Sequence, residues 1–390
     1  MTASATSLNI GIVGAGGFAN FAAKCFAMVD GIKIVAVADA NLPAAATLAD
    51  AFDAEAYIDF EQFLTDDAID LVYIATPPSL HYQQSRLALL AGKHVICEKP
   101  AALSTKDAEQ LVALATAANL LYVVNLMQRY NPIYEIVKQI VDKKLLGEFT
   151  HGYFENYASD EFLNEAHWFW DDALSGGIFI EHGVHFFDLF SGWLGQGELI
   201  YAAKWKRPDG ETEVYDRVTA IVNYSCGPVT FYHGFDQPRV LDRQEMRLQF
   251  ERGDVTLYGW IPVRLKLGGL LDLDGIANLE SMIPEAKVEI LAPTEGEVAT
   301  QPIGSETGLE RPGTRSVKGR FKQIGFDHHV SITHGDDSQK MGVYADLLRK
   351  MIIDQRAWIF DHSVERVTDA NNAVESLRIA QAATTAANRF

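Results

Sequence analysis

The chain of 390 residues carries 33 Lys and Arg against 52 Asp and Glu, a formal net charge of −19. So acidic a chain matches neither a phosphate backbone nor an anionic membrane surface, so we expect neither nucleic acid nor a membrane as partner. Its length exceeds what one hydrophobic core usually supports, and 48% hydrophobic with 22% charged residues is ordinary for a globular protein, so two domains are expected.

The first residues, MTASATSLNI, lack the basic and apolar regions of a signal peptide, and no apolar run approaches the roughly 18 residues of a membrane span. We therefore expect a cytoplasmic protein. The three cysteines, Cys25, Cys97 and Cys226, are widely spaced without a C-x-x-C pair. Neither a disulfide framework nor a thiolate metal site is encoded by that spacing.

The first third of the chain alternates between strand and helix patterns. It opens with a short apolar run over 8–13 (LNIGIV), the turn GAGG and the helix-like FANFAAKCFAM. Because strands that alternate with helices build a parallel, doubly wound sheet, we expect residues 1–125 to form an α/β domain of that kind. Its further expected elements are strands at 33–39, at 70–76, from His94 and at 121–125, and helices near 79–91 and from about Ser104, where Ser104 and Asp107 form a capping box.

The turn after the first strand carries a dinucleotide-binding pattern. Gly14, Gly16 and Ala19 fit G-x-G-x-x-[GA], and Asp39 stands at the end of the second strand. Gly14 permits the tight turn, Gly16 lets the backbone approach a pyrophosphate, and the small Ala19 allows close packing of helix on strand. A plain structural turn is the alternative, but the flanking elements and the spaced acid favour a Rossmann domain. Asp39 would accept hydrogen bonds from the adenosine ribose and repel a 2′-phosphate, so NAD is favoured over NADP.

A ligand of a doubly wound sheet lies at the carboxyl ends of its strands. The loops expected there are 14–17, 76–81 and 98–100, and a lysine before a proline at a strand end points into the crevice. The candidates for cofactor binding in and beside these loops are Gly14, Gly16, Gly17, Phe18, Ala19, Asp39, Thr76, Pro77, His81, Glu98 and Lys99.

The segment 175–192, SGGIFIEHGVHFFDLFSG, places polar residues within an apolar helix pattern. Glu181, His185 and Asp188 fall on one helix face, and His182 widens that stripe. A stripe of this kind must face water, a partner or a ligand. A metal site made of Glu181 and the two histidines is conceivable chemically, but no further ligand is evident, and we expect none.

From about Gly147 the patterns become strand-like, with period-two alternation and short turns. They predict an antiparallel sheet with one covered face, and the helix with the polar stripe is expected to cover it. The segment from about 262 to 330 is interpreted as a long insertion or loop, because it is rich in Gly, Pro and Glu around 294–314.

The segment 151–170, HGYFENYASDEFLNEAHWFW, is dense in aromatic and hydrogen-bonding side chains. Aromatic faces stack on sugar C–H faces while amides, carboxylates and imidazoles bind hydroxyls, so this composition suits a sugar or polyol pocket. Packing of the domain interface is an equal alternative for any single residue. The substrate candidates here are Tyr153, Asn156, His167 and Trp168.

Several motifs together resemble the Gfo/Idh/MocA oxidoreductases, the group of glucose-fructose oxidoreductase and inositol dehydrogenase. They are ATPPSLH (75–81), AGKHVICEKP (91–100), the passage NLMQRYNPIYEIVKQIVDKKLLGEF (125–149) and GG-x-x-x-E-x-G-x-H-x-x-D (176–188). The resemblance implies a Rossmann domain followed, over 126–390, by an α+β domain for substrate binding and oligomerisation. The sheet of this second domain is expected to be open and mostly antiparallel, and the protein a homo-oligomer, dimer or tetramer.

The resemblance also implies catalytic roles. The lysine of EKP and the histidine of the second motif lie beside the reacting carbon in that family, assisted by an acidic residue, which points to Lys99, His185 and Glu181. The family more often has Asp where this chain has Glu181. The substrate candidates combine these residues with others from the aromatic segment, the passage between domains and the polar stripe. They are Lys99, Gln128, Tyr153, Asn156, His167, Trp168, His182 and His185.

The sequence thus predicts an NAD(H)-dependent oxidoreductase that acts on a secondary alcohol or ketone of a sugar, cyclitol or related polyol. In this hypothesis His185 takes the hydroxyl proton and Lys99 stabilises charge on the reacting oxygen. Two alternatives stay open: a glycosidase that uses NAD for transient oxidation, and a non-catalytic NAD-binding sensor.

Overall fold

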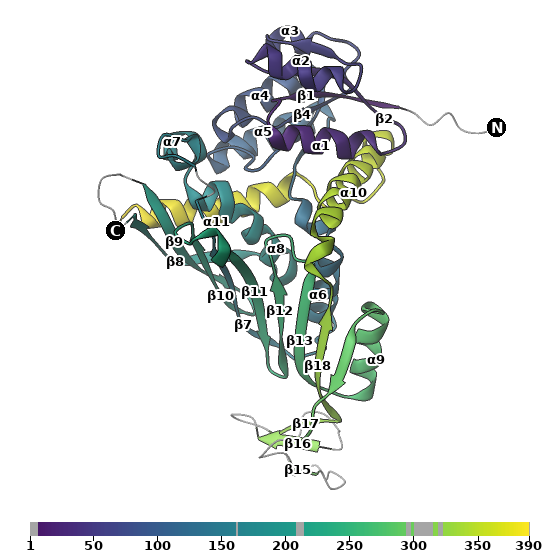
Figure 1. Ribbon diagram of the computed structural model, residues 1–390, viewed down its shortest axis with the longest axis vertical. Coiled ribbons are helices and arrows are strands. Elements are labelled where there is room, and N and C mark those ends of the chain that lie inside the picture. The colour runs from purple at the N-terminus through teal and green to yellow at the C-terminus, as the bar shows by residue number, and fades with distance from the viewer. Residues whose placement is uncertain are drawn as a thin grey trace, which may run out of the picture.

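The first six strands form a parallel sheet in the order β3-β2-β1-β4-β5-β6 (Figure 1). The computed structural model describes residues 7–160, 163–207, 214–293, 298–299, 315–318 and 323–389. The strand order reverses between β1 and β4, which makes their carboxyl ends the switch point of the sheet. The predicted doubly wound α/β sheet is confirmed. Its elements are β1 (Leu8–Val13), α1 (Gly17–Ala27), β2 (Ile32–Ala38), α2 (Leu42–Asp50), β3 (Glu55–Tyr57), α3 (Phe60–Leu64), β4 (Leu71–Ile74), α4 (Pro78–Leu90), β5 (His94–Cys97), α5 (Thr105–Ala118) and β6 (Tyr122–Val124).

The helix starts follow local chemistry. The Ser104 hydroxyl accepts a hydrogen bond from the Asp107 N–H at 3.2 Å and begins α5, as the capping pattern predicted. Asn131 caps α6 (Pro132–Asp142) in the same way, and Pro132 occupies its first position, where no N–H is needed. These two helices therefore begin where their sequences indicate.

A second, larger sheet has the order β14-β18-β13-β12-β11-β7-β10-β9-β8. All neighbours in it are antiparallel except β7 and β10, so the predicted open, mostly antiparallel sheet is confirmed. Its strands are β7 (Phe149–Tyr157), β8 (Gly197–Lys206), β9 (Tyr215–Tyr224), β10 (Gly227–Gly234), β11 (Arg243–Phe250), β12 (Gly253–Tyr258), β13 (Arg264–Leu271), β14 (Lys287–Ile290) and β18 (His328–His334).

The segment 262–330 is more ordered than a loop. β13 lies inside the sheet and buries Leu265 and Leu267, and α9 (Leu273–Met282), β14, β16 (Arg315–Lys318) and β17 (Gln323–Phe326) follow. The loop interpretation is wrong for these residues. Gly268 and Gly269 interrupt the strand pattern of β13. The close approach of β12 to β13 depends on Gly253 of β12, where a Cβ would clash with the Gly268 oxygen. Apart from β15 (Val298–Ala299), most of the Gly- and Pro-rich part, 294–314, lies outside the described residues.

Helix α8 (Val184–Leu194) covers one face of the second sheet, as expected. Phe154 of β7 stacks on Phe186 of α8 with ring centroids 3.6 Å apart, and Phe187 packs edge-on against Phe231 of β10. Alternate β7 residues such as Tyr153 therefore lie on the opposite face of the sheet.

Two C-terminal helices join the two units (Figure 1). Helix α10 (Lys340–Phe360) packs against α1 and contributes Leu347 and Met351 to the core of the Rossmann unit. Helix α11 (Ala370–Ala387) packs against α5 on one side and against α8 and β8 on the other. The chain thus returns to its first unit after completing the second.

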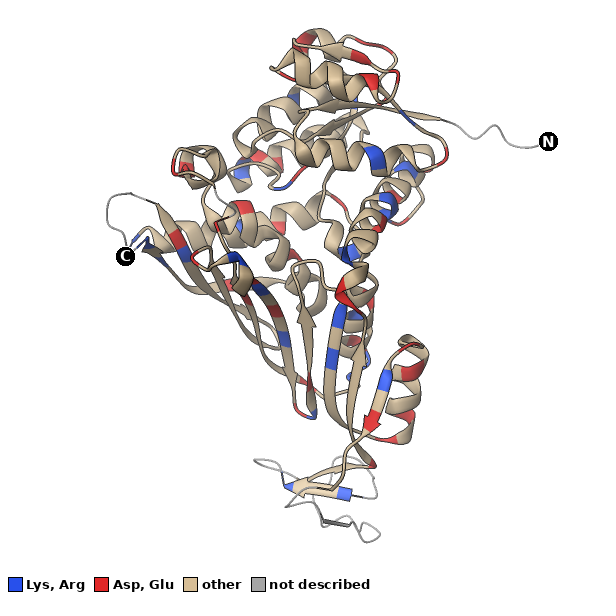
Figure 2. Ribbon diagram, in the orientation of Figure 1, with Lys and Arg blue, Asp and Glu red and all other residues tan. Residues whose placement is uncertain are grey.

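Figure 2 shows Lys and Arg interspersed with Asp and Glu along the ribbon of both units. Among the described helices none combines the length and the apolar character needed to cross a membrane.

Candidate active site

The glycine turn at the end of β1 has the geometry that its pattern predicted. Gly14 has φ +93°, and a Cβ there would lie 2.6 Å from the Ala75 oxygen, so the position requires glycine. Gly16 caps α1 without a side-chain hydrogen bond, and a Cβ on Gly16 or Gly17 would meet no atom within 4 Å. No described side chain occupies the space beside these two glycines, and the first N–H groups of a helix have no partner within it, which suits an anionic group such as a pyrophosphate.

Asp39 holds this turn in place. Its carboxylate accepts hydrogen bonds from the Ala15 N–H and the Asn41 N–H, both at 2.7 Å. The side chain therefore lies beside the glycine turn at the end of β2, where the sequence placed the acceptor of an adenosine ribose.

His81 ties together the loops at the switch point. Its two ring nitrogens lie 2.7 Å from the Thr76 oxygen and 2.7 Å from the Pro100 oxygen, and burial lowers its pKa. A neutral imidazole carries one N–H, so His81 donates to one of these carbonyl oxygens and lies beside the other, and it links the two loops that were predicted to touch the cofactor. Thr76 is further held through its hydroxyl, which donates to Gln84 at 2.6 Å, and Pro77 caps α4.

Glu98 lies at the carboxyl end of β5. It accepts hydrogen bonds from the Tyr73 hydroxyl and from Asn125 Nδ2 at 2.7 Å. Burial raises the pKa of Glu98 despite these donors and the neighbouring charge of Lys99. The residue that follows Glu98, Lys99, contacts the second unit.

Lys99 joins the Rossmann unit to the second domain. Its Nζ lies 2.5 Å from Glu181 Oε1 and 2.8 Å from the main-chain oxygen of the same residue. The two side chains retain only 18% and 11% of their exposure. Glu181, one methylene longer than the aspartate typical of the resembled family, thus reaches the lysine directly.

The polar stripe does not follow a regular α-helix. Residues Phe179–Gly183 form a π-helical turn that leads into α8, and such turns are frequent at functional sites. The stripe therefore divides among separate partners: Glu181 binds Lys99, and Asp188 binds Arg129 through two carboxylate contacts of 2.7 and 2.8 Å. The pair with Arg129 gives Asp188 a structural role.

His185 is almost completely buried, at 5% exposure. Burial lowers its pKa well below the ordinary value, and the nearby charge of Lys99 and His182 lower it further. Among the described residues its Nδ1 has no hydrogen-bond partner, and its ring centroid lies 6.2 Å from that of Trp260. His185 is therefore a neutral imidazole within the electrostatic reach of Lys99.

His182 faces a second histidine that lies on β10. His182 Nδ1 and His233 Nδ1 are 2.9 Å apart, and burial followed by the charge of Lys99 lowers the pKa of His182 to about 3. The structure thus brings Lys99, Glu181, His182 and His185 together, as the sequence predicted.

The remaining substrate candidates are not all near Lys99, Glu181 and the two histidines. Gln128 donates to the Trp260 oxygen at 2.6 Å, next to His185. Asn156 is buried on the α8 side of β7 and donates to Gly234 at 3.1 Å, whereas Tyr153 lies on the far face. His167 caps a 3₁₀ turn, Trp168–Trp170, and contacts that turn rather than Lys99.

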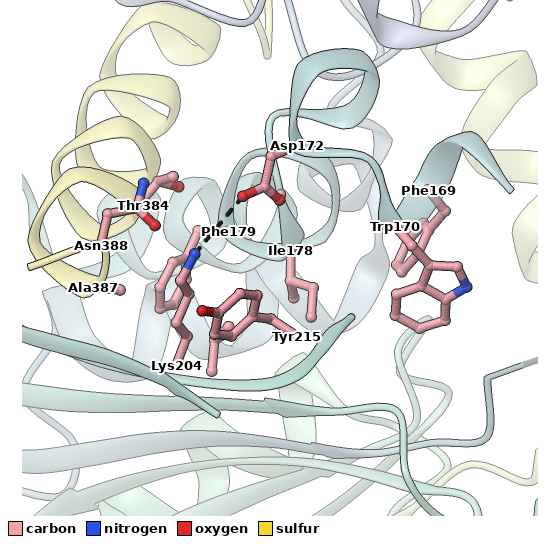
Figure 3. A pocket seen from close by; sticks show the side chains of 12 residues that line it. Phe169, Trp170, Asp172, Ile178, Phe179, Lys204, Tyr215, Thr384, Ala387 and Asn388 are labelled. Carbon is pink, nitrogen blue, oxygen red and sulfur yellow. Dashed lines mark ion pairs between the residues drawn. The ribbon is translucent and has the colours of Figure 1, made fainter. Parts of the chain in front are cut away.

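A separate small cavity of about 20 Å³ lies beside this aromatic turn (Figure 3). Inside it Lys204 Nζ is 3.8 Å from the Tyr215 ring centroid and 3.8 Å from Asp172 Oδ2. Neither Lys99 nor His185 lines it. We therefore do not assign the chemistry to this cavity.

Two family models match the chain, "Oxidoreductase family, NAD-binding Rossmann fold" over residues 8–126 and "GFO/IDH/MocA C-terminal domain" over residues 134–256. The chain belongs to the Gfo/Idh/MocA family. Its Rossmann unit and its second sheet are the two domains typical of that family.

Individual Gfo/Idh/MocA relatives are distant. An uncharacterized oxidoreductase, YrbE of Bacillus subtilis (strain 168), is 26% identical over 63% of this chain and 65% of its own length. The NADP(+)-dependent scyllo-inositol 2-dehydrogenase IolU of the same organism is 30% identical over 34% of this chain and 41% of its own length. The matched part of the chain thus spans about two thirds or less of these relatives.

A solved structure shows the same fold over nearly the whole chain. The WlbA dehydrogenase of Bordetella pertussis, in complex with NADH and UDP-GlcNAcA, superposes with a TM-score of 0.76 at 18% identity, covering 98% of this chain and 96% of its own. At that identity the likeness establishes the fold of this Gfo/Idh/MocA protein and leaves its ligands open.

Three residues of this site were missed by the sequence reasoning: Arg129, His233 and Trp260. A signal existed for His233, since the alternation in GPVTFYHG puts it on the same strand face as Phe231. Within the described ranges no three His, Cys, Asp or Glu side chains are grouped to hold a metal ion.

Proposed function

We propose that the protein is an NAD(H)-dependent oxidoreductase that transfers hydride between nicotinamide and a secondary alcohol or ketone of a sugar, cyclitol or related polyol. The observation that carries the proposal is the contact of 2.5 Å between Lys99 and Glu181. It brings a cation from the carboxyl end of β5 against the π-helical turn that carries His182 and leads to His185. A buried cation beside a neutral imidazole is an arrangement suited to an oxygen that gains negative charge.

Lys99 would hold the reacting oxygen. An ammonium group has three N–H donors, and Glu181 accepts two of them through its carboxylate and its main-chain oxygen. The third donor remains for the substrate, whose developing alkoxide the positive charge stabilises. Glu181 then acts as a positioning residue that aims Lys99.

His185 would exchange the hydroxyl proton. It is neutral near pH 7 because burial lowers its pKa, so it is available as an acceptor without prior loss of a proton. The same environment disfavours the imidazolium that results, so the proton must pass on to solvent for oxidation to continue. Because oxidation releases this proton, alkaline pH should shift the equilibrium toward the ketone, while the rate gains nothing from deprotonating a His185 that is already neutral.

The cofactor fits the residues that are present. Bound NAD supplies the hydride acceptor, which no side chain of the protein can provide. The open space above Gly16 and the helix N–H groups suit its pyrophosphate, and Asp39 suits an adenosine ribose with a free 2′-hydroxyl. Because relatives include both an NADH complex and an NADP(+)-dependent enzyme, Asp39 is the feature that favours NAD here.

The test is a screen for NADH formation against sugars, cyclitols and aromatic diols, followed by single substitutions. With an active substrate, Lys99→Ala and His185→Ala should each lower turnover by about 10²–10⁴-fold while NADH binding, read by fluorescence titration, persists. Lys106→Ala and His151→Ala remove exposed residues of the same types and serve as controls. Unchanged turnover in both site variants would sink the assignment.

Other results of the same screen identify the alternative functions. Release of free sugar from glycosides without net NADH formation would identify a glycosidase. Tight NAD binding with no turnover of any compound would favour a sensor protein.

The homo-oligomer and the cytoplasmic location stay predictions. The edge strand β8 exposes Ile200, Tyr201 and Trp205, at 62%, 41% and 45%, which is a composition that favours self-association. Light scattering after gel filtration would measure the oligomer size.

A further inference from the structure

The pair of His182 and His233 joins the π-helical turn to strand β10. Their Nδ1 atoms are 2.9 Å apart, which requires that one ring donates a hydrogen and the other accepts it. The proposed reaction uses Lys99, Glu181 and His185 and assigns no task to this pair.

His233 is fully buried in an aromatic box. Its ring centroid lies 5.0 Å from Phe154, 6.2 Å from Phe179 and 5.9 Å from Phe186, and its exposure is 0%. Its second nitrogen, Nε2, has no hydrogen-bond partner among the described residues. A charged imidazolium has nothing to stabilise it in this box, and burial accordingly lowers the pKa of His233 well below its ordinary value.

The unpartnered nitrogen indicates where the hydrogens lie. A neutral imidazole carries one hydrogen, and a buried N–H without an acceptor is rarer than a buried acceptor without a donor. The hydrogen of His233 is therefore expected on Nδ1, where it donates to His182. Since Nδ1 of His182 then accepts, the hydrogen of His182 must lie on Nε2.

The remaining nitrogen of His182, Nε2, is the one expected to meet a ligand. The side chain is partly exposed, unlike that of His233. The charge of Lys99 lowers the pKa of His182, and His182 in turn lowers that of His185, so the three groups share one electrostatic environment.

We propose that His233 is a positioning residue that holds His182 as an Nε2–H donor toward a substrate oxygen adjacent to the one bound by Lys99. The inference rests on the proposed function for its substrate, while the hydrogen positions are testable without any substrate. A polyol, which offers neighbouring oxygens on consecutive carbons, is the class of ligand that such paired donors recognise.

A matched set of substitutions at His233 tests the proposal. The amide nitrogen of Asn replaces Nδ1 of a histidine, whereas that of Gln extends to the place of Nε2. We expect His233→Gln and His233→Leu to raise the KM for the polyol about tenfold, the value of one hydrogen bond, with kcat and the Kd for NADH little changed. His233→Asn should keep KM within about threefold of the wild type.

A purely structural role predicts another pattern. If His233 only fills the aromatic box, Asn harms the protein at least as much as Leu does, and stability rather than KM is what changes. Equal KM in all variants, or an Asn variant as impaired as the Gln variant, would overturn the proposal. Thermal unfolding of each variant shows whether it folds.

Nitrogen NMR of protein labelled with ¹⁵N-histidine gives the second measurement. With the His182 signal assigned by its loss in His182→Ala, we expect a single neutral tautomer with the hydrogen on Nε2, and a mixture of tautomers in His233→Leu. A hydrogen on Nδ1 of His182 would overturn the proposal. Because this signal needs no substrate, a failed polyol screen sinks the proposed function and leaves the hydrogen positions to be judged by themselves.

Discussion

The Rossmann side of the site is made largely of backbone groups, whereas the helix side is made of buried side chains. On the Rossmann side Gly14, Asp39 and His81 shape or fasten loops, and their partners are main-chain N–H and C=O groups. On the helix side His182 and His185 are neutral imidazoles packed among aromatic rings.

The two sides of the site tolerate different substitutions. A binding surface made of backbone groups is disrupted when a side chain is added at Gly14 or when the carboxylate of Asp39, which binds the turn, is removed. A surface built of buried polar side chains fails when one partner of a pair is lost, because the other is left in a medium that solvates it poorly. The ion pair of Lys99 and Glu181 joins the Rossmann side of the site to the helix side.

The largest effect on stability is expected at the ion pair between Arg129 and Asp188, the latter a residue of helix α8. Asp188 is 1% exposed, so Arg129→Met leaves a buried carboxylate without its cation and should lower the free energy of unfolding by about 3–5 kcal/mol. Urea unfolding of the wild type and the variant measures this loss of unfolding free energy. The control is Arg264→Met, which breaks an exposed pair with Asp337 and should cost about 1 kcal/mol or less. Equal losses in the two variants would show that burial does not distinguish these pairs.

The next effect concerns the carboxylate on the Rossmann side. Removing Asp39 deletes an acceptor for two N–H groups and the expected partner of the adenosine ribose. Asp39→Ala should lower the ratio of kcat/KM for NAD over NADP by about 10–100-fold, the value of a hydrogen bond to a charged group. Steady-state kinetics with both cofactors measure the ratio, and Asp67→Ala, an exposed carboxylate, is the control. A wild-type protein that prefers NADP contradicts this reading of Asp39.

A smaller effect should follow from adding one methyl group to the glycine turn. Gly14→Ala places a Cβ at positive φ and 2.6 Å from the Ala75 oxygen, a strain of about 1–3 kcal/mol that should weaken NADH binding and lower the Tm together. Gly17→Ala is the matched control, because its Cβ meets no atom within 4 Å. Identical Tm values for the two variants would contradict the tight turn.

The comparison also separates what could be predicted from what could not. The glycine turn, Asp39 and the strand ends follow from local patterns, because each uses neighbours in sequence. The partners on the helix side are remote: His182 and His233 are 51 residues apart, and Arg129 and Asp188 are 59 apart. Because residues Phe179–Gly183 form a π-helical turn, the polar side chains of the predicted stripe point in directions other than those of a regular α-helix. The periodicity of a single sequence does not encode such a turn.

The smallest expected effect, the share of a single histidine in the slope of stability with pH, tests whether the histidines are buried as neutral rings. The pKa values of His182, His185 and His233 are all lowered chiefly by burial, and those of His81 and His94 are lowered too. In the unfolded chain an ordinary histidine binds a proton below about pH 6.5, so acid favours unfolding. Stability should therefore be complete above that pH and fall below it, by up to about 1.4 kcal/mol per pH unit for each such histidine.

A substitution isolates the share that belongs to His185. His185→Gln cannot titrate, so the free energy of unfolding between about pH 6 and 5 should fall less steeply than in the wild type, by the slope of one histidine. His151→Gln removes an exposed histidine and should leave the slope unchanged. Parallel slopes for the wild type and His185→Gln would mean that His185 takes up a proton in the folded protein. It would then be charged beside Lys99, and the helix side would be an electrostatic surface rather than a neutral one.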